Sequence, residues 1–219
     1  MYLVLDFGNT LTKFFLFKGK EVIDSECLSP KDAFNKIHKI LTLNEEIKGL
    51  IYSDVAVEIN EKLVDLAKEI PVIAINSSIK LPFVNEYESK STLGADRIAL
   101  VAAAVITYPK KNTLVIDLGS CITYDFVSQG NTYKGGAISP GFEMRYKALN
   151  TFTGKLPLLF GKIPENPEGN STIDSIHSGV YFGVLDEIIG RIEYYQEEYG
   201  VLTVILTGGD ANKLPKTLK

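Results

Sequence analysis

Residues 2–16 read Tyr-Leu-Val-Leu-Asp-Phe-Gly-Asn-Thr-Leu-Thr-Lys-Phe-Phe-Leu, and residues 113–127 read Thr-Leu-Val-Ile-Asp-Leu-Gly-Ser-Cys-Ile-Thr-Tyr-Asp-Phe-Val. The two segments align at one constant offset, so that Asp6 matches Asp117 and Thr12 matches Thr123. A repeat of this length that occurs only twice indicates two duplicated lobes, because a solenoid would need more and shorter repeats.

Each copy of the repeat predicts a β-hairpin. A buried apolar strand leads into a tight turn at the aspartate, and a second strand rich in aromatic and β-branched residues follows. Polar turns at residues 18–20 and 129–131 end the second strands. Further strands are predicted at residues 50–52, 72–75 and 202–206. Helices are predicted from Ser29-Pro30 onward, over 58–68, from Thr92 or its neighbours to before Pro109, over 175–199 and after Gly209. The combination predicts an α/β fold with mixed sheets, in lobes of residues 1–109 and 110–219.

The composition excludes several classes of protein. The 219 residues are 45% hydrophobic and 23% charged, which is typical of a globular chain. The net charge of −4 argues against a nucleic-acid-binding surface. Cys27 and Cys121 have no metal-ligand spacing and indicate reduced thiols. The apolar run after Met1 is too short for a membrane span and lacks the flanks of a signal peptide, so we expect a cytoplasmic protein without a membrane segment.

The repeated turns have the composition of anion-binding loops. Gly8 and Gly119 let the backbone approach an anion closely, and the hydroxyl and amide side chains beside them add neutral donors. Asp6 and Asp117 would repel a phosphate directly, so each implies a cation between the carboxylate and the anion. The alternative is that the Asp-x-Gly sequence only caps a strand in both copies.

Two further glycine turns extend this pattern. Residues 204–210, Val-Ile-Leu-Thr-Gly-Gly-Asp, read as a strand, a turn and a helix start, a geometry that can accept a base and a ribose. Residues 135–141, Gly-Gly-Ala-Ile-Ser-Pro-Gly, read as a loop before a helix, either an anion cradle or a tight connection. The sequence has no Walker-type loop, which excludes the P-loop class.

The turns at 6–10, 117–120 and 207–210 resemble the two phosphate motifs and the adenosine motif of the actin-like ATPase and sugar-kinase superfamily. More narrowly, residues 94–97 (Gly-Ala-Asp-Arg), the 135–141 segment, and Thr172 with Ser178-Gly179 resemble type III pantothenate kinases. This resemblance implies a duplicated ribonuclease-H-like fold, with two lobes around a nucleotide cleft, and a homodimer.

The resemblance also implies a reaction. The γ-phosphoryl group of ATP would be transferred to pantothenate, giving 4′-phosphopantothenate, in the first step of coenzyme A biosynthesis. Asp96 would be the catalytic base that an alcohol nucleophile needs at neutral pH. Asp117 would bind a monovalent cation, K⁺ or NH₄⁺, and Mg²⁺ would accompany ATP. The substrate-binding residues would be Tyr87, Gly94, Ala95, Asp96, Arg97 and Thr172. The nucleotide-binding residues would be Asp6, Phe7, Gly8, Asn9, Thr10, Leu11, Thr12, Lys13 and Ser120.

Other interpretations are weighed against this one. A non-catalytic transcriptional accessory member of the family, or another small-molecule kinase on the same scaffold, are the alternatives. Asp96 beside Arg97 favours the enzyme, although without the resemblance the two would read as a surface ion pair. We expect His38 to be a surface residue, His177 to be structural, and the tyrosines of residues 194–199 to serve in packing or at a subunit contact. Ser120-Cys121 departs from the Thr-Ala usual in the family but keeps a hydroxyl group.

Overall fold

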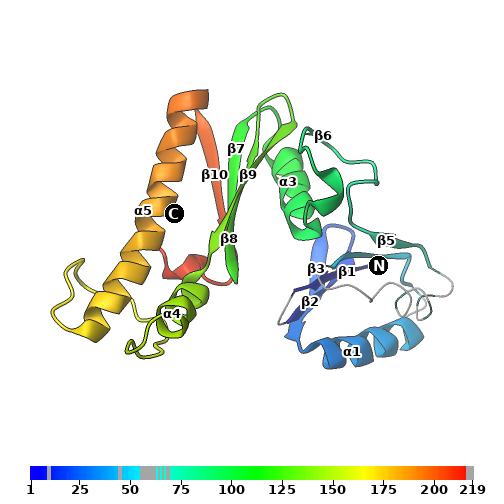
Figure 1. Ribbon diagram of the computed structural model, residues 1–219. Coiled ribbons are helices and arrows are strands. Elements are labelled where there is room, and N and C mark those ends of the chain that lie inside the picture. Colours follow the sequence, from blue (N-terminus) through cyan, green and yellow to red (C-terminus); the bar gives the residue numbers. More distant parts are fainter. Residues whose placement is uncertain are drawn as a thin grey trace. The chain divides into compact units, whose positions relative to one another are not determined.

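The computed structural model describes residues 1–8, 11–43, 46–54, 63, 65, 67 and 70–215, and it contains two compact units (Figure 1). The first unit comprises Met1–Leu81 and Glu88–Leu100, and the second comprises Pro82–Tyr87 and Val101–Lys219. Pro82–Tyr87 belongs to the second unit because its short strand β6 (Val84–Asn85) pairs with that unit's sheet.

The sheet of the first unit has the strand order β3-β2-β1-β4-β5. The strands are β1 (Tyr2–Phe7), β2 (Thr12–Lys18), β3 (Glu21–Leu28), β4 (Gly49–Asp54) and β5 (Val72–Ala74). β1, β2 and β3 form an antiparallel meander, and β4 runs parallel to β1. The predicted hairpin is confirmed, whereas β3 is an additional strand. Its exposed edge sequence, Glu-Val-Ile-Asp-Ser-Glu-Cys-Leu, lacks the apolar alternation from which a strand is predicted.

Helix α1 (Pro30–Leu43) covers one face of this sheet. The helix starts where predicted, since the Asp32 N–H donates a hydrogen bond of 3.2 Å to Ser29 Oγ. Leu3 and Leu5 of β1 pack with Ile37 of α1, and alternation along the strand directs Asp6 to the opposite face. The helix predicted over residues 58–68 lies outside the described residues, except for three positions.

The sheet of the second unit has the order β10-β7-β8-β9-β6. Its remaining strands are β7 (Asn112–Leu118), β8 (Cys121–Val127), β9 (Thr132–Pro140) and β10 (Leu202–Thr207). β7, β8 and β9 form an antiparallel meander, and β10 runs parallel to β7. The order β9-β8-β7-β10 repeats β3-β2-β1-β4 with the same strand directions, so the duplication predicted from the sequence is confirmed in the topology.

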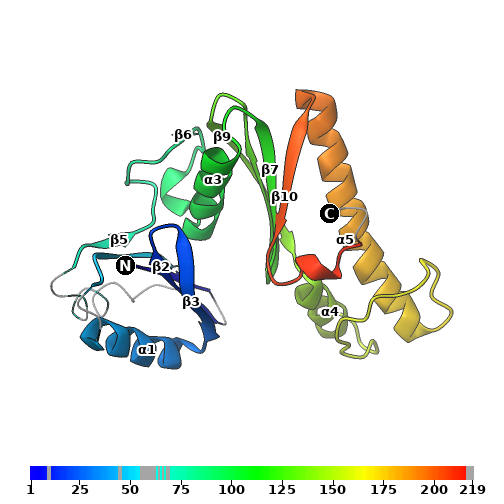
Figure 2. The same cartoon turned by 180° about the vertical axis from the view of Figure 1, so that it is seen from behind.

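Two helices pack on one face of the second sheet. α5 (Thr172–Tyr199) runs along the sheet beside β10, and α4 (Phe142–Thr151) follows β9 (Figure 2). Tyr195 and Tyr199 stack on Phe126 with ring centroids 4.7 and 4.3 Å away, which confirms a packing role for these tyrosines. None of the described helices combines the length and the apolar character needed to cross a bilayer.

The helix predicted from Thr92 or its neighbours is α3 (Ala95–Thr107), which ends before Pro109 as predicted and begins three residues after Thr92. Thr92 itself lies in a 3₁₀ turn, η1 (Lys90–Thr92). Two other local predictions are wrong. Residues 135–140 are part of β9 rather than a loop, because Gly136 lets the strand lie directly against the backbone of Tyr124. In the part of the chain that the structure describes, a short 3₁₀ turn, η2 (Ala211–Lys213), replaces the helix predicted after Gly209.

The two hairpins differ in register although their sequences align. Asp6 is paired with Lys13 across the first hairpin, but Asp117 is paired with Thr123 across the second. The second turn is one residue tighter: the Gly119 N–H donates to the Cys121 carbonyl at 3.0 Å, whereas the Gly8 N–H reaches the carbonyl of Leu11 at 3.1 Å. The sequence match of Thr12 with Thr123 is therefore not a match of position beside the two aspartates.

Candidate active site

The first acidic turn follows β1, and its carboxylate is held from both neighbouring strands. Ser53 Oγ on β4 donates a hydrogen bond of 2.6 Å to Asp6 Oδ1, and Lys13 Nζ on β2 lies 3.3 Å from Asp6 Oδ2. The Phe7 side chain faces the core against Phe34 and Tyr52. Asn9 and Thr10 lie outside the described residues, and Leu11 is exposed.

The second acidic turn lies directly against the glycine turn of the expected adenosine motif. Thr207 at the end of β10 is paired with Asp117, and the Asp210 N–H donates to the Leu118 carbonyl at 3.0 Å. Gly208 has a φ of +94°, and a Cβ atom there would overlap Asp117 Oδ1 and the Leu118 backbone. Glycine is needed here both for its backbone conformation and for this close approach. Two motifs far apart in the sequence thus form one surface.

Ser120, at the tip of the second turn, is exposed and contacts the start of α4. The Gly141 N–H donates to the Ser120 carbonyl at 3.1 Å. A Cβ atom on Gly141 would lie 2.5 Å from the Gly119 carbonyl oxygen and 2.6 Å from that of Ser120. Gly141 belongs to the segment expected to be an anion cradle or a tight connection, and at this position the connection is tight.

The residues around Asp117 suit a hard cation. Thr123 is on the same face of the hairpin, because residues paired across an antiparallel ladder share a face. Its side chain is 8% exposed, and among the described residues its hydroxyl oxygen has no hydrogen-bond partner. A carboxylate and an unpaired hydroxyl oxygen are the donors that an alkali or alkaline-earth ion prefers.

The Gly-Ala-Asp-Arg segment forms the first turn of α3. Asp96 Oδ1 accepts a hydrogen bond of 2.8 Å from the Arg97 N–H, and the same oxygen contacts Gly94 so closely that a Cβ atom would overlap it. Asp96 is partly exposed, whereas Ala95 and Arg97 are buried, Arg97 to 5% exposure. The geometry fixes the carboxylate of Asp96 at a helix N-terminus, where the helix dipole stabilises negative charge.

Tyr87, predicted nine residues before Asp96, is positioned by the second unit. Its ring stacks on Tyr133 with a centroid distance of 6.0 Å, and its N–H donates to Asn85 Oδ1 at 2.9 Å. The ring also lies 3.5 Å from the place of a Cβ atom on Gly135, whose φ is +105°. Tyr133 in turn donates to Asp125 Oδ1 at 2.6 Å, so a buried polar residue supports the aromatic pair.

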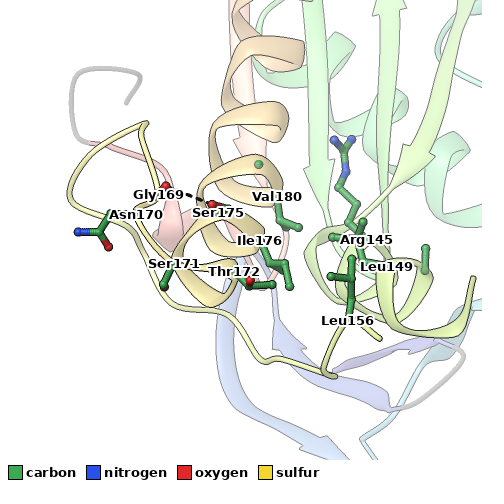
Figure 3. Close-up of a pocket in the computed structure, with 12 residues that line it drawn as sticks. Arg145, Leu149, Leu156, Gly169, Asn170, Ser171, Thr172, Ser175, Ile176 and Val180 are labelled. Carbon is green, nitrogen blue, oxygen red and sulfur yellow. Dashed lines mark hydrogen bonds between the residues drawn. The ribbon is translucent and has the colours of Figure 1, made fainter. Parts of the chain in front are cut away.

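Thr172, at the N-terminus of α5, lines a cavity of about 980 Å³ in the second unit. Figure 3 shows Thr172 and Ser171 on one side and Leu149 and Leu156 on the other. Thr172 is exposed, and Ser171 caps the helix by accepting from the Asp174 N–H at 3.1 Å. The cavity therefore combines an apolar wall with hydroxyl groups, as small-molecule sites commonly do.

Neither His38 nor His177 lines this cavity. His177 is buried and its Nδ1 lies 2.9 Å from the Tyr146 hydroxyl, which supports the structural role expected for it. His38 is exposed on α1, as predicted.

Several residues that contact or lie beside the predicted site residues were not predicted. Ser53 binds Asp6, Tyr133 stacks on Tyr87, and Arg145 lines the cavity beside Thr172. A signal for Ser53 does exist: it is paired with Asp6 as Thr207 is paired with Asp117, so aligning β4 with β10 would have identified it.

Comparison with known proteins identifies the family. The model of the family described as type III pantothenate kinase matches residues 2–194. A type III pantothenate kinase of Flavobacterium psychrophilum is 43% identical over 219 residues, which cover all of this chain and 91% of the relative. A type III pantothenate kinase of Bacteroides fragilis is 38% identical, and the match covers 90% of that relative.

Among solved structures, the ethanolamine utilization protein EutJ from Carboxydothermus hydrogenoformans is 14% identical, with a TM-score of 0.50 over 95% of this chain and 76% of that one. At this identity the likeness shows the fold alone, and it agrees with the two-lobed α/β architecture predicted from the repeat. The matches of the family model and the curated relatives confirm the family predicted from the motifs: this chain belongs to the type III pantothenate kinases.

Proposed function

We propose that Asp96 is the general base in the ATP-dependent phosphorylation of pantothenate, the kinase activity that membership of this family gives the chain. The observation that carries the proposal is the fixed, partly exposed carboxylate of Asp96 at the start of α3. It would accept the proton of the pantothenate hydroxyl as that oxygen attacks the γ-phosphorus and the bond to the ADP oxygen breaks. One Asp96 oxygen is bound by the Arg97 N–H, so the second oxygen is the one that takes the proton.

Tyr87, the Gly94–Arg97 segment and Thr172 are the proposed contacts of pantothenate. The stacked ring of Tyr87 offers an apolar face and a hydroxyl group, and Thr172 offers a hydroxyl group at the rim of a partly apolar cavity. These groups match a ligand with a branched aliphatic part, hydroxyl groups and an amide. The Arg97 guanidinium group suits a carboxylate.

Asp6–Lys13 and Ser120 are the proposed nucleotide contacts. Lys13 supplies positive charge, and the N–H groups around the glycine turns suit phosphate oxygens. Mg²⁺ would accompany ATP and shield the phosphate charge from Asp6. K⁺ or NH₄⁺ would be held by Asp117 with the hydroxyl oxygen of Thr123, supplying positive charge beside the second turn.

A homodimer in the cytoplasm is part of the proposal. Phe152 is 86% exposed and Phe160 72% exposed, both in the region between α4 and α5, and together with Ile163 they offer the apolar surface that subunit contacts use. The free cysteines Cys27 and Cys121 are consistent with a reducing compartment. Sedimentation of the purified protein at twice the mass of 24.2 kDa would support the dimer.

The decisive experiment is phosphorylation of radiolabelled pantothenate with Mg-ATP, with and without K⁺. We expect labelled 4′-phosphopantothenate, and we expect Asp96→Asn to lose roughly 10²–10⁴-fold in kcat while ATP affinity is kept. Near-normal turnover by Asp96→Asn would exclude Asp96 as the base. Phosphorylation of a sugar or of acetate but not of pantothenate would favour the alternative of another small-molecule kinase. ATP binding without turnover on any acceptor would favour the non-catalytic, regulatory alternative.

A further inference from the structure

A polar cluster lies between α5, β8, β9 and α4, and its centre is Glu187. Tyr124 donates a hydrogen bond of 2.8 Å and Ser139 one of 2.6 Å to Glu187 Oε1, while an Arg145 nitrogen binds Oε2. The Glu187 and Arg145 side chains are 25% and 21% exposed. All three partners are donors, and they come from three different elements. Ser139 belongs to the 135–141 segment and Tyr124 to the 113–127 repeat, whereas Arg145 and Glu187 lie outside the motifs recognised in the sequence.

The charges of this cluster are maintained at neutral pH. Burial alone would raise the pKa of Glu187, but the hydrogen bonds from Ser139, Arg145 and Tyr124 outweigh it and hold the pKa below its usual value. Burial and the hydrogen bond to Glu187 raise the pKa of Tyr124, so its hydroxyl stays a donor. Glu187 and Arg145 therefore form a lasting ion pair that is partly shielded from water.

Arg145 connects the ion pair to the second acidic turn. Its Nε donates a hydrogen bond of 2.8 Å to the Pro140 carbonyl, in the corner between β9 and α4. The next residue, Gly141, donates to the Ser120 carbonyl and touches the Gly119 and Ser120 backbone. A displacement of the Pro140–Gly141 corner is therefore transmitted directly to Ser120, because no side chain separates the two backbones.

The Glu187–Arg145 ion pair also adjoins the cavity that Thr172 lines. Arg145 is one of its lining residues, and in Figure 3 the Arg145 side chain extends from α4 away from Thr172. Glu187 is on α5, the helix whose N-terminus carries Thr172. The ion pair thus joins the helix of the cavity to the corner that supports Ser120.

We propose that Glu187 and Arg145 are positioning residues that fix the Ser120 turn relative to the Thr172 cavity. The inference rests on the proposed function only in taking Ser120 as a nucleotide contact and Thr172 as a substrate contact. Neither Glu187 nor Arg145 is proposed to contact a reacting atom; Arg145 acts through the Pro140–Gly141 corner.

Two variants and one control test the proposal. Glu187→Gln keeps the size of the side chain but removes its charge, and Arg145→Lys keeps the charge but loses the fork that reaches both Glu187 and Pro140. Asp186→Asn is the matched control, since it neutralises an exposed carboxylate one position away on the same helix. Each variant is made in the full chain and compared with the wild type.

The first measurement is hydrogen exchange of the Gly141 amide and of the peptides that contain Ser120. We expect exchange at least about tenfold faster in Glu187→Gln and Arg145→Lys, because both substitutions weaken the charged hydrogen bond between Arg145 and Glu187 that supports the Pro140–Gly141 corner. We expect no change in Asp186→Asn. This readout needs no substrate, so it stands even if pantothenate is not phosphorylated. Exchange equal to the control in both variants would overturn the inference.

The second measurement is steady-state kinetics with ATP and pantothenate. A positioning role predicts a KM for ATP raised about tenfold with kcat changed by less than about threefold. A purely structural role would lower the active fraction, and therefore the apparent kcat, at unchanged KM, and that result would also overturn the inference. If Arg145→Lys fails to fold, the isosteric Glu187→Gln decides. Faster exchange without any pantothenate kinase activity in the wild type would refute the proposed function and leave the positioning role intact.

Discussion

Gly208 and Gly209 are adjacent and equivalent in sequence, but we expect alanine to destabilise the protein at Gly208 and not at Gly209. Gly208 has a φ of +94°, and its added Cβ would lie 2.4 Å from the Leu118 carbonyl oxygen, whereas ordinary contacts begin at 3.4 Å. The backbone of β7 would have to move by about 1 Å at Leu118. Strain at this φ costs about 1–3 kcal/mol, and overpacking adds about 1–3 kcal/mol. Gly209→Ala is the matched control, because its Cβ would meet nothing within 4 Å among the described residues.

Thermal unfolding of the two variants measures this difference. For a chain of this size, the expected loss lowers the Tm of Gly208→Ala by about 5–20 °C, while Gly209→Ala stays near the wild type. Because the displaced atoms include the Asp117 carboxylate, we also expect Gly208→Ala to lose any activation by K⁺. Equal Tm values for the two variants would refute the reasoning, since they would mean that the close approach of the 207–210 turn to β7 is absent.

Three further predictions concern substitutions of single residues. Gly94→Ala should displace the Asp96 carboxylate and lower kcat by at least about tenfold, whereas Gly190→Ala, at an exposed position of α5 with no described atom near its Cβ, should not. Equal kcat values for the two variants would contradict the packing of Asp96 on Gly94. Asp117→Ala should abolish the difference in kcat between K⁺ and Na⁺ buffers, and a retained difference would place the cation elsewhere. Glu187 has a lowered folded pKa, so its stabilisation is complete above the unfolded pKa of about 4.3 and is lost as the pH falls through the folded value. The Tm difference between the wild type and Glu187→Gln should therefore shrink below about pH 4, which unfolding curves from pH 3 to 7 would check.

The fold could be predicted from the sequence to the extent that it depends on the repeat. The strand–turn–strand pattern around Asp6 and Asp117 defines the central hairpin of each sheet, and the topology repeats as expected. β3 was missed because an exposed edge strand carries no apolar alternation. The strand containing Gly135 was misread as a loop, since glycine is as compatible with a close strand contact as with a turn.

The sequence predicts candidate site residues only where a repeat or a resemblance singles them out. Asp117 was proposed because its turn repeats the turn of Asp6, and Asp96 was proposed because the Gly-Ala-Asp-Arg segment resembles the family's motif. Ser53 and Glu187 escaped because their importance depends on strand and helix packing, which brings them to Asp6 and Arg145 from distant parts of the chain. A serine at a strand end and a glutamate in a helix are too common to be distinguished by type.

The register difference between the hairpins explains why two similar turns would use different cations. Across from Asp6 lies Lys13, whose ammonium group is 3.3 Å away, so the first carboxylate has a cation built into the neighbouring strand. Across from Asp117 lies Thr123, a neutral residue whose buried hydroxyl oxygen can only add to a ligand shell. One residue fewer in the second turn places a hydroxyl oxygen where the first turn has an ammonium group, and a carboxylate beside a hydroxyl oxygen suits a metal ion. The register difference therefore supports the proposal that the monovalent cation binds at the second turn.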